Sequence, residues 1–480
     1  MNTIFEDSVP GRGAHIVEGD PEAVGKTIPE SLRRSAPADL PQCSELDVVR
    51  HFTRLSRRNF SVDANFYPLG SCTMKYNPKF AEHVASLPGF LGLHPHLAEL
   101  PGFGAWVQGA LSCLFDTERY LCEITGMDAF TLQPMAGANG EFTGVSLMAA
   151  YHRSLGRRRT IMLIPDSAHG TNPASAALAG FDVLDVPSEG GLVDPEAVAR
   201  ILSERGEDVA GLMMTCPNTL GLMETHLPAI VEELRKADAL LYYDGANMNA
   251  ILGKMRVGDA GFDVVHLNLH KTFGTPHGGG GPGSGPVGVT ARLAPLLPGP
   301  RVVKGNDGVY ALEEIPGSIG PVAPFHGSFG VILKALAYIM RLGGEGLVRV
   351  AEYATLNANY LKKRLETVLD VPYGDLCAHE FVASAPEGLH ALDIAKALLD
   401  RGIHAPTIYF PLIVKECLMA EPTETESKQT LDEYVDALAD IVDRAGKDPA
   451  FLPAAPTTLP VSRPDETTAA RHLRLTLDMA

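Results

Sequence analysis

Two apolar segments of the chain each lead into a group with acid–base chemistry. Residues 240–243 run directly into Asp244, and residues 264–267 are followed by a His-Lys pair whose lysine, Lys271, lies 27 residues after Asp244. Short continuous apolar runs are typical of strands buried in a parallel sheet, and the carboxyl ends of such strands meet at one edge. We therefore expect the acid and the lysine to lie close together at that edge.

This pair of side chains suits one cofactor in particular. A lysine amine held at a strand end can form an imine with an aldehyde, and an acid on a neighbouring strand can keep a pyridine nitrogen protonated. Pyridoxal 5'-phosphate (PLP) needs these two groups from a protein. A lone lysine at a strand end is usually a solvated charge, so the prediction depends on the paired acid, the apolar runs and the glycine-rich stretch that follows.

Two further segments could contact the rest of such a cofactor. Residues 133–141 are rich in small side chains and precede a helical stripe of Phe142, Val145 and Met148. The free N–H groups at a helix start favour an anion, here a phosphate, although a plain glycine-rich turn is the alternative. His169 follows the apolar run 160–164. Its ring could stack on a pyridine, although a hydrogen-bonded loop histidine is the alternative.

The chain divides by composition into four parts. Residues 1–100, rich in Pro and Gly, are expected to form an N-terminal arm, and residues 101–340 a large PLP-binding domain. Residues 341–450 are expected to form a smaller α+β domain, and residues 451–480 a tail rich in Pro and Thr. Because apolar runs alternate with helical stretches in the large domain, the fold class is α/β with a mostly parallel sheet covered on both faces.

The predicted elements follow from hydrophobic periodicity. Strands are expected at residues 160–164, 183–186, 211–215, 240–243, 264–267, 286–289 and 381–384, and helices at residues 142–155, 227–237, 331–368, 391–401 and 431–445.

Composition excludes several classes of protein. A net charge of −18 argues against nucleic acid as a partner. The chain lacks a run of about 18 apolar residues, and its first residues lack the pattern of a signal peptide, so we expect no membrane contact. The seven cysteines are scattered without a C-x-x-C pair, which favours a cytoplasmic location over a disulfide framework or zinc site.

Two motifs are weak. Residues 283–288 fit G-x-G-x-x-G, but they precede a strand and carry a proline where a helix should begin. His266, His270 and His277 lie close in sequence without the spacing or carboxylate of H-E-x-x-H. We therefore expect no metal site.

Longer segments carry a family resemblance. Residues 67–78, 167–175, 244–250, 266–286 and 421–428 are similar to those of the glycine cleavage system P-proteins, the glycine decarboxylases. The His-Lys-Thr-Phe and His-Gly-Gly-Gly-Gly-Pro-Gly sequences are long enough to be specific. The length and the first residues resemble the split bacterial form, in which the lysine-bearing half is a separate subunit.

The resemblance implies a PLP-dependent enzyme of fold type I, similar to aspartate aminotransferase. Lys271 would bind the cofactor covalently, Asp244 would pair with the ring nitrogen, and His169 would stack on one ring face and take part in catalysis. Ala246 would pack on the other ring face. The backbone of Ala138 and Asn139 would hold the phosphate, and Thr272 would add a further contact.

The resemblance also implies a reaction and partners. Glycine would lose its carboxyl group, and the aminomethyl group would pass to the lipoyl arm of the H-protein. The other half of the site would come from a separate chain, subunit 1, in a heterotetramer of two subunit types.

Two other functions share these residues. Another fold type I enzyme, such as a cysteine desulfurase or a decarboxylase of larger amino acids, would use the same acid, histidine and lysine. A desulfurase needs a reactive cysteine after the lysine, and only Cys377 and Cys417 follow Lys271. The other alternative is a non-catalytic PLP-binding scaffold subunit, against which the intact Asp244–Lys271 pair argues.

Overall fold

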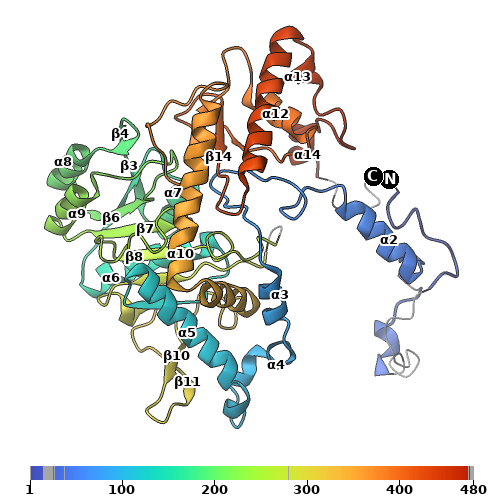
Figure 1. The fold of residues 1–480 in the computed structure, drawn as a ribbon. Coiled ribbons are helices and arrows are strands. Elements are labelled where there is room, and N and C mark those ends of the chain that lie inside the picture. The colour runs from blue at the N-terminus through green and yellow to red at the C-terminus, as the bar shows by residue number, and fades with distance from the viewer. Residues whose placement is uncertain are drawn as a thin grey trace. The chain divides into compact units, whose positions relative to one another are not determined.

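The computed structural model describes residues 2–13, 25, 27–36, 38–278, 281–473 and 475. Gly279 and Gly280 of the glycine-rich stretch, and most of the last seven residues of the predicted tail, lie outside the described residues. The chain falls into two compact units, Met1–Ser61 and Val62–Ala480 (Figure 1). The domain boundaries expected at residues 100, 340 and 450 stay predictions. No helix in the described residues is long and apolar enough to cross a membrane.

The first unit contains the short helix η1 (Glu30–Leu32) and the longer helix α2 (Glu45–Ser56). A reciprocal cap defines the start of α2. The Ser44 hydroxyl accepts the Asp47 N–H at 3.2 Å, and the Asp47 carboxylate accepts the Ser44 N–H at 3.0 Å. Together the two bonds satisfy two backbone donors that a helix start leaves free.

A seven-stranded sheet forms the centre of the second unit. Its strands are β1 (Ala129–Thr131), β2 (Ile161–Pro165), β3 (Asp182–Val186), β6 (Val209–Met214), β7 (Leu240–Gly245), β8 (Val264–Leu267) and β9 (Val287–Val289). Their order is β1-β9-β8-β7-β6-β2-β3. Neighbours from β8 to β3 pair in parallel, whereas β9 is antiparallel to both β8 and β1. The predicted mostly parallel sheet is confirmed.

Helices cover both faces of this sheet. They are α5 (Gln108–Thr125), α6 (Gly137–Ser154), α7 (Thr171–Leu178), α8 (Pro195–Arg205), α9 (Leu227–Lys236) and α10 (Phe329–Leu365). Tyr242 packs in a core with residues of α6 and α7, and Tyr243 packs in a core with residues of α5, α8, α9 and α10. Because successive strand side chains point to opposite faces, β7 is buried on both sides.

A smaller antiparallel sheet has the order β12-β14-β13. It comprises β12 (Phe381–Ser384), β13 (Thr407–Ile408) and β14 (Cys417–Ala420), and it packs with α11 (Ala391–Leu399) and α12 (Lys428–Lys447). The C-terminal part of α10 contributes Leu361 and Leu365 to the same core. The predicted helix over residues 331–368 is interrupted at Gly343, where φ is 59°. That backbone conformation favours glycine.

The remaining elements are short. They are α3 (Lys79–Ala85), α4 (Pro88–Leu91), η2 (Pro95–Ala98), η3 (Gly104–Trp106), β4 (Ser188–Glu189), β5 (Leu192–Val193), η4 (Ala294–Leu296), β10 (Arg301–Lys304), β11 (Tyr310–Glu313), α13 (Phe451–Ala454) and α14 (Glu466–Arg471).

A substitution at Gly211 in β6 can test how closely the sheet is packed. A Cβ atom there would lie 2.3 Å from the Leu240 carbonyl oxygen and 2.4 Å from the Met148 methyl carbon. We expect Gly211→Ala to lower the free energy of unfolding by about 1–3 kcal/mol, because the neighbouring strand would have to move. Thermal unfolding measures the change. Gly109→Ala in α5 is the control, since a Cβ there meets nothing within 4 Å. Equal melting temperatures for the two variants would contradict the prediction.

Candidate active site

The parallel strands β7 and β8 bring Asp244 and Lys271 to one edge of the large sheet. The register pairs Asp244 with His266. Lys271 lies in the turn after β8, where its backbone N–H donates to the Asn268 carbonyl at 3.0 Å. The acid and the amine therefore occupy the edge at which α/β folds bind their ligands.

Asp244 is a buried carboxylate surrounded by hydrogen-bond donors. Its Oδ2 accepts from the Asn172 amide at 2.9 Å, and its Oδ1 accepts from the Ala246 N–H at 3.1 Å. His266 Nε2 lies 3.4 Å from Oδ1. Burial alone would raise the pKa of Asp244, but His266, Asn172 and Ala246 outweigh burial and lower the pKa below its usual value. Asp244 is therefore ionised at neutral pH.

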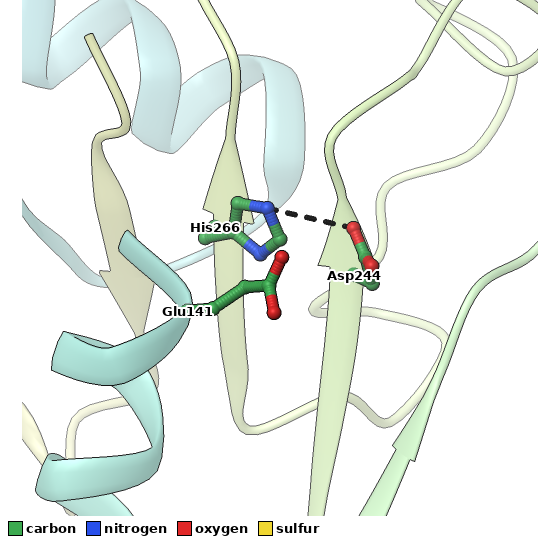
Figure 2. Close-up of side chains that lie close together, drawn as sticks. All are labelled: Glu141, Asp244 and His266. Atoms are coloured by element: carbon green, nitrogen blue, oxygen red, sulfur yellow. Dashed lines mark ion pairs between the residues drawn. The ribbon is translucent and has the colours of Figure 1, made fainter. Parts of the chain in front are cut away.

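A second buried acid, Glu141 of α6, faces Asp244 and His266 (Figure 2). Its carboxylate accepts from the Thr171 hydroxyl at 2.7 Å and from the Ser175 hydroxyl at 3.2 Å. Burial, followed by the charge of Asp244, raises the pKa of Glu141 to about 7. Two neighbouring buried carboxylates do not both ionise readily, so Glu141 carries the proton of the pair for much of the time.

Glu141, Asp244 and His266 offer ligand atoms within 4.8 Å of one another, as a metal site would. The carboxylates already accept amide and hydroxyl donors, and His266 Nδ1 lies 2.7 Å from the Tyr242 hydroxyl. Burial lowers the pKa of His266, so the ring is neutral. We interpret this cluster as support for the Asp244 charge, and the absence of a metal stays a prediction.

A strained loop holds the amine of Lys271. The Nζ atom of Lys271 donates a hydrogen bond to the carbonyl oxygen of Ser71 at 2.6 Å. Ser71 and Thr73 have φ of 64° and 51°, a left-handed conformation that is uncommon outside glycine. Residues held in this region often belong to functional sites.

His169 and Ala246 stand near the same edge. His169 is exposed, and its Nδ1 lies 2.8 Å from the Thr171 hydroxyl, whose oxygen also contacts Glu141. Ala246, two residues after the acid, is partly exposed. The hydrogen bond to Thr171 orients the imidazole, and the small side chain of Ala246 leaves space beside Asp244.

The start of α6 is suited to an anion. Among the described residues, no side chain caps this helix, so the N–H groups of its first turn, which includes Ala138 and Asn139, lack helical partners. The Asn139 side-chain oxygen accepts the Met135 N–H at 3.0 Å, which stabilises the preceding loop. A Cβ on Gly140 would lie 2.6 Å from the Gly285 carbonyl oxygen. Glycine is therefore required where the two loops meet.

Thr272 is buried next to Lys271 and forms hydrogen bonds through both its hydroxyl and its carbonyl oxygen. Its hydroxyl oxygen accepts the Met248 N–H at 2.8 Å, and its carbonyl oxygen accepts from Lys75 Nζ at 2.8 Å. Lys75 is itself buried and pairs with Glu424 at 2.6 Å. In this structure Thr272 holds the turn that carries Lys271, and its cofactor contact stays a prediction.

Several residues of this site received no role from the sequence. Glu141 lies four residues before Val145, so helical periodicity could have placed it on the buried face of α6. Asn172 lies in residues 167–175, a segment in which the sequence assigns a role to His169 alone. For Ser71 and Lys75 no local pattern exists, because their partners lie about 200 residues away in the chain.

These residues fit PLP. The ionised carboxylate at the end of β7, the amine in the turn after β8 and the uncapped helix start match a pyridine nitrogen, an aldehyde and a phosphate. The fold and the site define a PLP-dependent enzyme of fold type I.

Comparison with known proteins identifies the family. Residues 20–309 match the model of the glycine cleavage system P-protein, and residues 350–447 match that of the glycine dehydrogenase C-terminal domain. The chain is 52% identical, over 98% of its length and 97% of the relative, to the probable glycine dehydrogenase (decarboxylating) subunit 2 of Listeria monocytogenes serotype 4a. The chain belongs to the glycine cleavage system P-protein family.

Solved structures show the same fold. An inhibitor-bound glycine decarboxylase (P-protein) superposes with a TM-score of 0.72 over 88% of this chain and 95% of that chain, at 23% identity. The cysteine desulfurase CsdA of Escherichia coli superposes with a TM-score of 0.59 over 82% of this chain and 98% of that chain, at 17% identity. At such identities the likeness concerns the fold alone.

The Glu141 pKa predicts a pH-dependent stability. Because the folded-state pKa is raised to about 7 from 4.5, the protonated form stabilises the fold at low pH, and this contribution is lost as the pH rises through about 7. We expect Glu141→Gln to remove this loss, so that the variant gains on the order of 3 kcal/mol relative to wild type between about pH 4.5 and about pH 8. Thermal unfolding across that range measures the difference. A constant difference at every pH would contradict the assignment.

Proposed function

We propose that this chain is the lysine-bearing subunit of a glycine dehydrogenase (aminomethyl-transferring), the glycine decarboxylase of the glycine cleavage system. The enzyme would release the carboxyl group of glycine as carbon dioxide and pass the aminomethyl group to the lipoyl arm of the H-protein. The observation that carries the proposal is the position of Asp244 at the end of β7 and of Lys271 in the turn after the adjacent strand β8, in a chain that belongs to the P-protein family. A cytoplasmic location stays a prediction.

PLP supplies an electron sink for the electron pair that the departing carboxyl group leaves behind. Asp244 supports this chemistry because a permanent negative charge favours a proton on a ring nitrogen placed against it. The Asn172 amide and the Ala246 N–H hold the carboxylate in position. Glu141 lies in the same site and carries the proton of the acid pair, so Asp244 stays ionised.

Lys271 is the residue that changes its bonding in this proposal. Its Nζ is directed by the Ser71 carbonyl, and Thr272 and Lys75 hold the turn that carries it. A released amine at this position can accept or donate a proton at Nζ. The imidazole of His169 would cover one face of the bound ring and exclude water there, and the backbone N–H groups of Ala138 and Asn139 would bind the phosphate.

The desulfurase alternative is disfavoured by the cysteines. Both Cys377 and Cys417 are buried, and burial raises the pKa of each thiol to about 12. A nucleophilic cysteine needs an accessible thiolate. The alternative of a non-catalytic scaffold subunit does not explain why an ionised Asp244 is buried near the Lys271 amine.

Lys271→Ala tests the assignment directly. We expect the variant to lose glycine-dependent exchange of labelled bicarbonate, because its side chain can no longer bind the cofactor or carry a proton. Wild type should show an absorbance band near the visible edge, and borohydride should abolish it. The variant should lack this band before borohydride is added. Lys254→Ala, which removes an exposed lysine paired with Glu352 at 2.6 Å, should keep wild-type exchange. Full exchange in Lys271→Ala would refute the proposal.

The partner chain can be tested by co-expression. The name of the Listeria relative, subunit 2, implies a second subunit in that protein, and we propose that this chain likewise binds a subunit 1 in a heterotetramer. We expect the two chains to co-purify and bicarbonate exchange to require both, with lipoylated H-protein needed for the full rate. Full activity of this chain alone would contradict the heteromeric site.

A further inference from the structure

Two buried acids and a histidine lie beside Lys271 with no role in the chemistry above. His379, Glu380 and Glu421 are 2%, 4% and 0% exposed. Glu380 directly precedes β12, and Glu421 directly follows β14. Because the register pairs Phe381 with Ala420, the two acids are the next opposed pair along the antiparallel ladder.

Each carboxylate is held by backbone or amide donors. Glu380 accepts the Ser71 N–H at 2.6 Å. Glu421 accepts the Thr73 N–H at 2.9 Å and the Asn247 amide at 2.8 Å. Ligand atoms of the two acids and His379 lie within 4.8 Å of one another. Across the described part of the chain, neither acid forms an ion pair with a lysine or arginine.

The acids cannot both be ionised at low cost. Burial, followed by the charge of Glu421, raises the pKa of Glu380 to about 8. Burial also raises the pKa of Glu421, although Asn247 and Thr73 oppose the rise. At neutral pH the pair therefore holds one proton, and its titration belongs to both groups.

His379 is neutral and unsatisfied. Burial, followed by the charges of Lys271 and Lys75, lowers its pKa to about 3. Neither ring nitrogen has a hydrogen-bond partner within the described ranges, and Nε2 lies 3.7 Å from a Glu380 oxygen. A buried polar group without a partner costs free energy, so the cluster has a polar group available for a further contact.

One residue connects this cluster to Lys271. The carbonyl oxygen of Ser71 accepts from Lys271 Nζ, and its N–H donates to Glu380. The amine and the acid pair thus lie on two sides of the same strained residue. The other titratable groups facing the cluster are Lys75 and the thiols of Cys72, Cys377 and Cys417. Burial raises the pKa of each thiol, so all three are uncharged.

We propose that Glu380 and Glu421 share one proton and are the proton reservoir of Lys271. When the lysine is released as a neutral amine, a carboxyl O–H bond breaks and an N–H bond forms at Nζ, which leaves an ammonium beside two carboxylates. The proton returns when the amine is consumed again, and no electrons are transferred. His379, which is neutral and lies 3.7 Å from Glu380, adds no charge that would favour ionisation of both acids. The proposal rests on the proposed function.

Infrared titration of the full-length chain tests the shared proton without activity. With PLP bound to Lys271, wild type should show at pH 7 the carbonyl stretch of a protonated buried carboxyl in addition to that of Glu141, and this additional band should disappear as the pH rises through about 8. Glu380→Gln, which keeps an acceptor for the Ser71 N–H, should lack this band. A wild-type spectrum identical to that of Glu380→Gln, with the Glu141 band alone in both, would overturn the proposal.

Bicarbonate exchange by the complete complex supplies the second test. We expect Glu380→Gln to lower kcat by roughly 100-fold or more with the KM for glycine unchanged, and to abolish the pH dependence near 8. Glu421→Gln should act in the same way and decides the matter if the first variant fails to fold. Glu224→Gln, at a buried acid bound to Asn218, should retain the wild-type pH profile.

The outcomes separate the two proposals. A wild-type complex without exchange would contradict the proposed function. An active wild type whose pH profile survives in both Glu380→Gln and Glu421→Gln would overturn the proton reservoir alone.

Discussion

A buried negative charge at the end of β7 organises the centre of this molecule. An ionised carboxylate in a protein interior is stable only where donors surround it. Asp244 receives hydrogen bonds from Asn172 of α7 and from the Ala246 backbone, and His266 of β8 lies 3.4 Å away. Glu141 of α6 is part of the same arrangement, because the Asn172 amide donates to its carboxylate as well as to Asp244. The relative positions of two strands and two helices therefore depend on one charge.

A polar network links the turn that carries Lys271 to the region of the small sheet. The loop around Ser71 hydrogen-bonds to Lys271 on one side and to Glu380 of the small sheet on the other. Lys75 bonds to both the Thr272 carbonyl and Glu424. Because hydrogen bonds are directional, this network fixes the direction of the reactive amine more closely than hydrophobic contact would.

The fold was largely predictable from local patterns. The apolar runs located β2, β6, β7 and β8 to within a few residues, because each run is buried on both faces and its composition is uniform. The start of α6 was predicted five residues late, at residue 142 instead of Gly137. Small residues have weak helix propensity, and a helix start that is suited to an anion looks like a loop in sequence.

The sequence by itself determined that Asp244 and Lys271 each follow a buried apolar strand, since the composition and length of an apolar run are local properties. It also indicated the helix start at Ala138 and the loop with His169. Only the tertiary structure decided which groups face these residues. Ser71 meets Lys271 across 200 positions, and Glu380 meets Glu421 across the small sheet. Such contacts depend on the path of the whole chain, and no local pattern of side chains specifies that path.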